Sequence, residues 1–392
     1  GSVIVSGVRT PIGRLHGAFA GVPAVDLGAA AITGAIKQAG IGAEHVDYVI
    51  MGQVIQAGCG QNPARLASTK AGIGMSVPAM TLNKVCLSGL NAIALADLMI
   101  NAGDCDVVVA GGMESMTEAP HLLPGARKGF AYGDTTLLDA TAHDGLTDVY
   151  DHESMGASTE RHTASLGISR EEQDQLAARS HQRASEAAKN GRFDAELVAY
   201  PVPQRRGDPV VVDADEGVRQ DTTAESLGKL RPAFATNGTV TAGSSSQISD
   251  GGAATVVMSK AKAKELGRTV LAEIGHHGWV AGPDNSLLCQ PANAITTALR
   301  REGMAPSDLD LIEINEAFAS VAIQSIRQLD VDADKVNVDG GAIALGHPIG
   351  ATGARLALHL VHELHRRGGG IGAAGLCGGG GQGDAVVFRV AG

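Results

Sequence analysis

Aromatic residues are scarce in this chain of 392 residues: they make up 3% of the sequence, and only one is a tryptophan. Hydrophobic residues nevertheless account for 44%, so the core must be built from Ala, Val, Ile and Leu. Basic residues are also in deficit, with 31 Lys and Arg against 42 Asp and Glu and a net charge of −11. Nucleic-acid-binding proteins usually present a basic face. The composition therefore argues against a nucleic-acid partner, although a few local cations suffice to hold a small anion.

Cysteines are few: there are five, at irregular spacing, and none forms a CxxC motif. This odd number does not suggest a disulfide framework, and zinc-ligand spacing is missing. The nearest candidate metal ligands are His276-His277 and three histidines of LALHLVHELHRR, namely His359, His362 and His365. The spacing of those three favours a solvated or half-buried helix face. We therefore expect no metal site and no resident cofactor.

The sequence also has no evident long apolar run, and we expect no run to reach the roughly 18–20 residues of a membrane span. The 53 glycines follow no collagen-like or low-complexity period. Together these features predict an ordered globular protein with no membrane partner. Its length predicts two or three domains, and its cysteine usage fits a reducing, cytoplasmic setting.

Two segments resemble each other at a constant offset of 263 positions. Residues 31–52 have the sequence AITGAIKQAGIGAEHVDYVIMG, and residues 294–315 have AITTALRREGMAPSDLDLIEIN. Each has the pattern of a helix, a glycine stop and a strand, which is half of a βαβ unit. A second pair of turn–helix–strand patterns starts at VCLSGLNAIA and at HPIGATGARL. The pattern predicts a duplicated α/β fold, with chance similarity among alanine-rich helices as the alternative.

Between the copies lies a more polar stretch, residues 118–248. Ser169 is expected to cap a helix whose first turn holds Glu171 and Glu172. Residues 202–234 have few apolar pairs and are expected to form extended loops. Long irregular insertions of this kind are usually functional. An apolar strand, SDGGAATVVMS, then resumes the first copy, so the predicted domains are 1–117 with 249–270, the loop domain 118–248, and 271–392.

Three glycine-associated turns carry groups suited to acyl transfer: Cys86 in NKVCLSG, His347 in GGAIALGHPIGATG and Cys377 in CGGGGQG. Cysteine acts as a nucleophile in its thiolate form, and a helix start lowers the thiol pKa. We therefore expect a lowered pKa at Cys86, which precedes an apolar helix pattern. His347 suits a general base and Cys377 a second acid–base group. The alternatives for the cysteines are inert buried thiols or a disulfide between the two.

These turns, together with VVVAGGMESM and the NEAF sequence at 315–318, resemble the thiolase family, of the acetyl-CoA acetyltransferase type, over essentially the whole chain. The resemblance implies a duplicated five-layer α/β/α/β/α core with an inserted loop domain that binds CoA and mediates tetramerisation. It also implies reversible condensation of two acetyl-CoA molecules to acetoacetyl-CoA and CoA. Acyl-CoA and CoA would be the small-molecule partners, and the protein would be a homotetramer.

The resemblance further assigns a role to each catalytic position. Cys86 would carry the acyl group and His347 would be its base. Cys377 would exchange the α-proton of the second substrate. Asn315 would hold a water in an oxyanion hole shared with His347, and the backbone N–H groups of Cys86 and Gly379 would form a second hole.

Contacts with the substrate follow from the same resemblance. The residues expected near the pantetheine are Leu146 and Met155; those near the adenine and phosphates are Arg219 and Ser226; those in the tunnel wall are Phe234, Ala242, Ser246, Ala317 and Phe318.

The chain departs from the family pattern in three respects. Ser154 stands where related enzymes usually carry His, which would weaken a polar contact and alter the chain-length preference. Gly217 replaces a potassium-binding Tyr, so we expect no monovalent-cation site. Leu287-Leu288 replaces a Phe-Pro pair linked to 2-methyl substrates.

Other functions remain open at this point. One is a degradative 3-ketoacyl-CoA thiolase with a longer acyl tunnel, although NEAF in place of HEAF favours short chains. A decarboxylating ketoacyl synthase would carry His at position 377. A non-catalytic thiolase-like binding scaffold would have lost one of the three catalytic groups.

Overall fold

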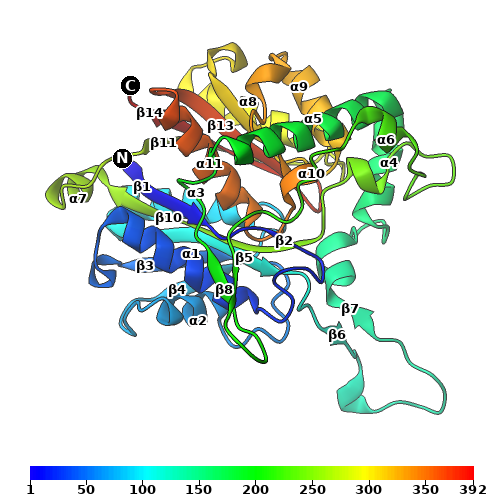
Figure 1. The fold of residues 1–392 in the computed structure, drawn as a ribbon, viewed down its shortest axis with the longest axis horizontal. Helices are drawn as coiled ribbons and strands as arrows, with labels where there is room; N and C mark the ends of the chain where they lie inside the picture. Colours follow the sequence, from blue (N-terminus) through cyan, green and yellow to red (C-terminus); the bar gives the residue numbers. More distant parts are fainter.

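A ten-stranded sheet runs through the molecule in a computed structural model that describes residues 1–392 (Figure 1). Its order is β12-β13-β14-β11-β1-β10-β5-β3-β4, and the short β2 pairs with β10. The strands of the first half are β1 (Ser2–Arg9), β2 (Gly13–Arg14), β3 (Tyr48–Gly52), β4 (Ala79–Leu82), β5 (Val107–Ser115) and β10 (Ser249–Ser259). Those of the second half are β11 (Ala272–Ala281), β12 (Leu311–Ile314), β13 (Gly370–Gly378) and β14 (Gln382–Val390). An antiparallel contact between β1 and β11 joins the halves.

The two halves repeat one topology. In the first half β1, β10 and β5 are antiparallel neighbours and β3 is parallel to β5. In the second half β11, β14 and β13 are antiparallel neighbours and β12 is parallel to β13. Helix α1 (Ala24–Ala39) precedes β3 just as α8 (Gln290–Glu302) precedes β12. The predicted duplication is confirmed.

The predicted glycine stops also end the repeated helices. Gly40 follows α1 with φ 65°, and Gly303 follows α8 with φ 69°. Both backbone N–H groups donate to carbonyls of the preceding turn. Glycine adopts this left-handed conformation without the penalty that a Cβ brings.

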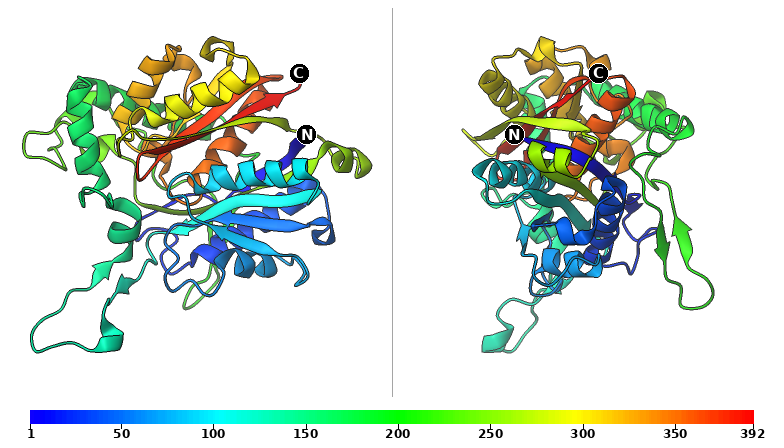
Figure 2. Two further views of the ribbon diagram at one scale, coloured as in Figure 1. Left: turned by 180° about the vertical axis from the view of Figure 1, so that it is seen from behind. Right: turned by 90° about the vertical axis from the view of Figure 1, so that its left-hand side faces the viewer.

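Helices and sheets form five layers (Figure 2). Helices α3 (Ser88–Ala102) and α11 (Thr352–Arg366) pack together between the two halves of the sheet. Helices α1 and α2 (Pro63–Lys70) cover the outer face of the first half. Helices α8 and α9 (Ala319–Leu329) cover the outer face of the second half. The fold is therefore the predicted α/β/α/β/α arrangement.

The central helix α3 overturns one expectation from the sequence. The segment Val85–Ala102 is 18 residues long with a mean hydropathy of 1.6, which is long and apolar enough to cross a membrane by length and composition. The expectation that no segment reaches this length is wrong. The apolar composition has a simple cause here, because α3 is covered on both sides by sheet and by α11.

The polar stretch 118–248 leaves the core and returns to it at β10. Its helices are α4 (Met155–Ser165), α5 (Arg170–Lys189) and α6 (Ala224–Gly228), and its hairpins pair β6 (His121–Leu122) with β7 (Leu138–Asp139) and β8 (Tyr200–Val202) with β9 (Val210–Val212). The remaining short helices of the chain are α7 (Lys260–Glu265), α10 (Ala342–Leu345), the 3₁₀ turns Ala43–His45, Ala126–Lys128, Ala242–Ser244, Pro306–Asp308 and Ala333–Lys335, and a π-helical turn, Thr141–Leu146.

Of two local predictions for this stretch, one is confirmed and one is wrong in part. Ser169 caps α5 as predicted: its Oγ accepts from the backbone N of Glu172 at 3.2 Å, and Glu172 accepts in return from the backbone N of Ser169 at 2.9 Å. The prediction of extended loops over 202–234 is wrong in part, because β9 and α6 form there. The β-branched run Val210–Val212 pairs with β8, and Thr223 caps α6.

Buried ion pairs tie this stretch to both halves. Arg9 of β1 contacts Glu196 and Asp215, each at 2.7 Å. His359 of α11 contacts Glu196 at 2.8 Å and Asp339 at 3.3 Å. Burial alone would lower the pKa of His359, but the two carboxylates raise it to about 10. The charged imidazolium therefore links the central helix to the inserted stretch.

The histidine-rich face of α11 accordingly differs from expectation. His359 is buried rather than solvated or half-buried, because its two carboxylate partners compensate the loss of water. His362 is partly buried and its Nε2–H donates to the carbonyl of Gly7 at 2.7 Å. Only His365 is exposed.

The crossing of α3 and α11 leads to a stability prediction. A Cβ on Gly353 would lie 2.3 Å from the backbone N of Leu90, so the two helices approach through glycine. We expect Gly353→Ala to force them apart and to lower the free energy of unfolding by about 1–3 kcal/mol. Urea denaturation measures this. Gly74→Ala is the control, because its Cβ would meet no atom closer than 3.7 Å. Equal unfolding midpoints for the two variants would contradict the close-crossing argument.

Candidate active site

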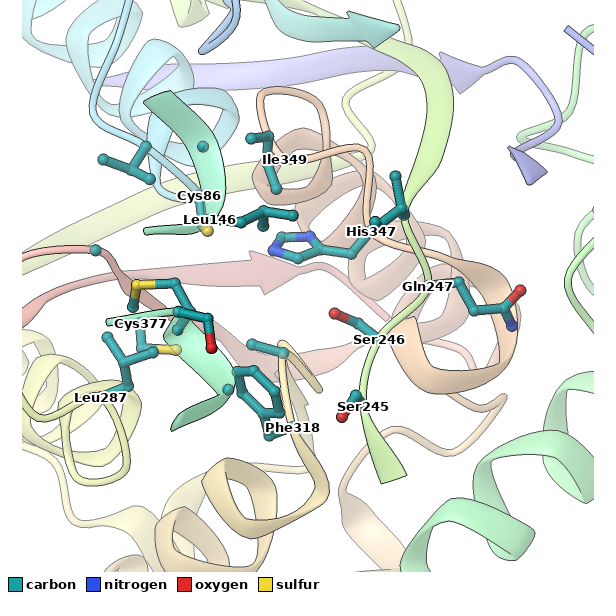
Figure 3. Close-up of a pocket in the computed structure, with 18 of the residues that line it drawn as sticks. Cys86, Leu146, Ser245, Ser246, Gln247, Leu287, Phe318, His347, Ile349 and Cys377 are labelled. Atoms are coloured by element: carbon teal, nitrogen blue, oxygen red, sulfur yellow. The ribbon is translucent and has the colours of Figure 1, made fainter. Parts of the chain in front are cut away.

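A cavity of about 390 Å³ lies where the two halves meet the inserted stretch (Figure 3). Most of its wall is apolar. The cavity brings together these residues singled out from the sequence: Cys86, Leu146, Met155, Phe234, Ala242, Ser246, Ala317, Phe318, His347, Cys377 and Gly379. Cys86 and Cys377 come from different halves of the repeat, and His347 lies beside them (Figure 3).

Cys86 lies in a strained turn just before α3. Val85 has φ 52°, a left-handed conformation that is costly for a β-branched residue. Side chains hold this turn in place. The Oδ1 of Asn83 accepts from the backbone N of Val85 at 2.9 Å. The Oγ of Ser88 accepts from the backbone N of Lys84 at 2.8 Å and donates to the carbonyl of Val85 at 2.6 Å. The turn therefore fixes the position of the sulfur at the cavity wall.

The acidity of Cys86 is opposite to the sequence-based expectation. Burial raises the pKa of the Cys86 thiol to about 12, and the nearby carboxylate of Glu114 adds to this. The backbone N–H groups of Cys86 and Gly379 act in the other direction by donating to the sulfur. The predicted lowering is wrong because loss of water outweighs these donors. These are the two N–H groups that the resemblance assigns to the second oxyanion hole, and that role stays a prediction.

His347 is buried and presents Nε2 to the cavity. Its Nδ1 lies 2.6 Å from the Oγ1 of Thr352, whose own proton is donated to the carbonyl of Pro348 at 2.9 Å. Thr352 must then accept a proton from Nδ1, and this assigns the lone pair to Nε2. Burial, followed by the charge of Arg355, lowers the pKa of His347 to about 3. The imidazole is therefore neutral at physiological pH, as a general base requires.

Asn315 follows β12 and faces His347. Its Nδ2 lies 3.3 Å from the His347 Nε2, and its backbone N donates to the carbonyl of Gly375 at 3.0 Å. Its Oδ1 is buried and has no partner. A buried amide oxygen without a partner is costly, so it offers an acceptor for a water or a substrate group.

Cys377 lies near the end of β13 and is 1% exposed. Burial raises the pKa of its thiol, and the nearby Cys86 adds to the rise. The chain then turns sharply: a Cβ on Gly381 would lie 2.1 Å from the carbonyl of Asp284. Glycine at this turn lets the backbone of Gly379 remain close to Cys86.

Two predicted substrate residues do not line the cavity. Arg219 is exposed, and its backbone N donates to His181 Nδ1 at 3.0 Å. Ser226 is also exposed and caps α6 together with Thr223, with hydrogen bonds of 3.0 and 3.1 Å. Their roles toward the adenine and phosphates remain predictions.

Two residues of the cavity wall and the neighbouring Thr352 have no predicted catalytic role. Ser154 and Leu287, noted as departures from the family pattern, both line the wall. Ser154 also caps α4, because its Oγ accepts from the backbone N of Ala157 at 3.1 Å. Thr352 orients His347 and lies in the GATG part of the quoted motif, so its spacing was the available signal.

Glu114 is a second support missed in the sequence. Its carboxylate accepts from the backbone N of Val54 at 2.9 Å, Ile55 at 3.1 Å and Gly350 at 2.9 Å. Burial raises its pKa to about 7. Its bond with the backbone N of Gly350 fixes the turn after His347. The VVVAGGMESM strand carries it, and a carboxylate near the end of an apolar strand was the signal.

The geometry suits acyl transfer between thiols. A neutral thiol, a neutral imidazole that carries its lone pair on Nε2, and N–H donors at the sulfur meet in an apolar cavity. No group of three or more His, Cys, Asp and Glu side chains is placed to hold a metal ion.

These acidities predict how acylation depends on pH. Protonation of His347 would stop its action as a base only near its pKa of about 3, and Cys86 would ionise by itself only near about 12. We therefore expect the rate of Cys86 acetylation by acetyl-CoA to be nearly constant from about pH 5 to 9. Stopped-flow acetylation with rapid quenching measures it. Glu114, with a pKa of about 7, holds the turn after His347 and would titrate within this range. A rise through a midpoint near neutrality that persists in Glu114→Gln would therefore contradict the assignment.

Comparisons with known proteins give the same picture as the site. Residues 2–261 match the model of the thiolase N-terminal domain, and residues 268–390 match the thiolase C-terminal domain. The chain is 58% identical to the "Probable acetyl-CoA acetyltransferase" of Mycolicibacterium smegmatis, covering 99% of this chain and 100% of that one. It is 52% identical to the "Acetyl-CoA acetyltransferase" of Cupriavidus necator, covering 99% and 98%.

A solved structure of similar shape is the Bacillus anthracis acetyl-CoA acetyltransferase, with a TM-score of 0.97, 41% identity and coverage of 99% of this chain and 98% of that one. Both halves of the duplicated fold, and nearly every residue of the chain, are thus accounted for by one family. The chain belongs to the thiolase family.

Proposed function

We propose that this protein is an acetyl-CoA C-acetyltransferase, which condenses two acetyl-CoA molecules to acetoacetyl-CoA and CoA and also catalyses the reverse thiolysis. The observation that carries the proposal is the convergence of Cys86, His347 and Cys377 on one apolar cavity. Two thiols are needed because one must hold the acyl group while the other handles a proton. The names of the relatives support the choice of acetyl-CoA.

In the first half-reaction Cys86 attacks the thioester carbonyl of acetyl-CoA. The His347 Nε2 takes the thiol proton as the new C–S bond forms, and then delivers it to the departing CoA sulfur. The backbone N–H groups of Cys86 and Gly379 stabilise the oxyanion of the tetrahedral intermediate. The products are acetyl-Cys86 and free CoA.

In the second half-reaction His347 takes the proton of Cys377, and the resulting thiolate removes the α-proton of a second acetyl-CoA. A water held by Asn315 and the Nε2–H of the resulting imidazolium stabilise the enolate oxygen. The enolate carbon attacks acetyl-Cys86, the C–S bond breaks, and the Cys86 sulfur takes its proton from His347. Acetoacetyl-CoA leaves and both thiols are restored.

The wider setting is proposed on the same grounds. The chemistry described needs no metal and no cofactor besides CoA, which is substrate and product. All five cysteines are free thiols, which supports a reducing, cytoplasmic compartment. The reaction belongs to fatty acid and lipid metabolism, since it makes or breaks a carbon–carbon bond between acyl units.

The division of labour between the two thiols can be tested directly. Mass spectrometry after incubation with acetyl-CoA should find one acetyl group, on Cys86. Cys377→Ala should keep this adduct but lose condensation by about 10²–10⁴-fold, because a positioned acid–base group is gone. Cys105→Ala, remote from the cavity, is the control. An adduct on Cys377 alone, or near-normal condensation by Cys377→Ala, would contradict the proposal.

We also propose that the protein is a homotetramer. The hairpin of β6 and β7, spanning 121–139, projects away from the body of the molecule (Figures 1 and 2). It exposes apolar side chains: Leu123 at 41%, Phe130 at 49%, Tyr132 at 109% and Leu137 at 56%. An arm with this much exposed apolar surface would be stabilised by contact with another copy of the chain.

The arm predicts a change of assembly on mutation. Replacing Phe130 and Tyr132 by Ser should convert tetramers to dimers, because the apolar contact surface is lost. Light scattering measures the mass, and Val211→Ser on the exposed hairpin of β8 and β9 is the control. A wild-type monomer would contradict any oligomer. A tetramer that survives the double substitution would show that the arm does not hold it.

A further inference from the structure

Gln247 lies at the cavity wall, but its side chain points away from the two cysteines (Figure 3). Its Nε2 lies within hydrogen-bonding distance of three backbone carbonyl oxygens: 3.1 Å from Gly217, 2.9 Å from Ile343 and 3.2 Å from Ala344. A carboxamide nitrogen carries two protons, so the three acceptors share them. One side chain thus joins the inserted stretch to α10, the short helix that leads into His347.

The main chain of Gln247 holds the catalytic turn as well. The backbone N of His347 donates to the carbonyl of Gln247 at 3.1 Å and to the Oγ of Ser249, also at 3.1 Å. The Ser249 hydroxyl donates in turn to the Gln247 carbonyl at 2.7 Å. Through its side chain and its main chain, Gln247 therefore forms hydrogen bonds with the backbone on both sides of Gly346.

Gly217, on the other side of this contact, has no room for a side chain. A Cβ on Gly217 would lie 2.7 Å from the Ala344 carbonyl oxygen and 2.9 Å from the Gln247 Nε2. Its neighbour Glu216 accepts from the backbone N of Arg14 at 2.8 Å and of Ala18 at 3.0 Å. The carbonyl of Gly217 is thus anchored to the first half, and it approaches the amide closely because position 217 has no side chain.

We propose that Gln247 is a positioning residue for His347: its carboxamide fixes the α10 turn against Gly217 and so holds the imidazole at the distance from Cys86 that proton transfer requires. The inference rests on the proposed acyl transfer. Gln247 touches none of the reacting atoms through its side chain, so its effect passes through the backbone of the turn. A misplacement of about 1 Å can cost about 100-fold in rate.

Gln247→Met keeps the length of the side chain and removes both donors. We expect the single-turnover rate of Cys86 acetylation to fall about 10- to 100-fold, while the KM for acetyl-CoA changes less than about 3-fold, since the cavity wall is kept. Gln38→Met is the matched control. Gln38 also joins the first half to the inserted stretch, donating to the Ala195 carbonyl at 2.7 Å and accepting from the backbone N of Gly7 at 2.9 Å. The Gln38→Met variant should be acetylated on Cys86 at the wild-type rate.

Gly217→Ala disturbs the same contact from the other side, and it should reproduce this kinetic pattern. The double variant should be little worse than either single one, because both changes break one contact. Loss of thermal stability with an unchanged acetylation rate would overturn the proposal. So would a raised KM with an unchanged rate, or strictly additive effects. Wild-type acetylation is measured in parallel, and its absence would instead refute the proposed function.

Discussion

Removal of water from the cavity controls the chemistry of this molecule. An ionised thiolate or imidazolium loses hydration there, and burial disfavours whichever form is charged. The pKa of Cys86 consequently rises to about 12 while that of His347 falls to about 3. The two values move apart, so a resting thiolate–imidazolium pair is strongly disfavoured. Proton transfer must then accompany attack on the thioester, when the developing charge meets the N–H groups of Cys86 and Gly379.

The fold supplies that dry environment by bringing together three distant parts of the chain. Cys86 precedes one central helix and His347 precedes the other, and these helices are packed between the halves of the sheet. Cys377 comes from a strand of the second half, and the inserted stretch closes the wall with Leu146, Met155 and Phe234. The buried contacts of Arg9 and His359 with Glu196 attach that stretch to the core. The duplication matters for this reason, since each half contributes one thiol.

Much of this was predictable from sequence because the signals are local. The helix–glycine–strand repeats, the cap at Ser169 and the three glycine-associated turns each depend on neighbours in the chain. The cavity-lining residues could be named through the resemblance to a family. Acidity could not be predicted, because it depends on how densely distant segments surround the Cys86 sulfur. A helix start suggested a lowered pKa, but the loss of water was larger.

Long-range side-chain partners also escaped prediction. Glu114 and Gln247 act through bonds to backbone groups that the fold brings near, and their residue types do not indicate which groups those are. The helical spacing of His359 predicts a solvated or half-buried face, but two carboxylates from elsewhere in the chain make its full burial possible.

The central claim is that Cys86 rests as a neutral thiol beside a neutral imidazole. Thiolate absorbs in the ultraviolet, so a pH titration of the difference between the wild-type protein and Cys86→Ser reports the ionisation of that one sulfur. The account predicts no difference signal from about pH 5 to 9. A step in thiolate absorbance within that range, present in the wild type and lost in Cys86→Ser, would contradict it.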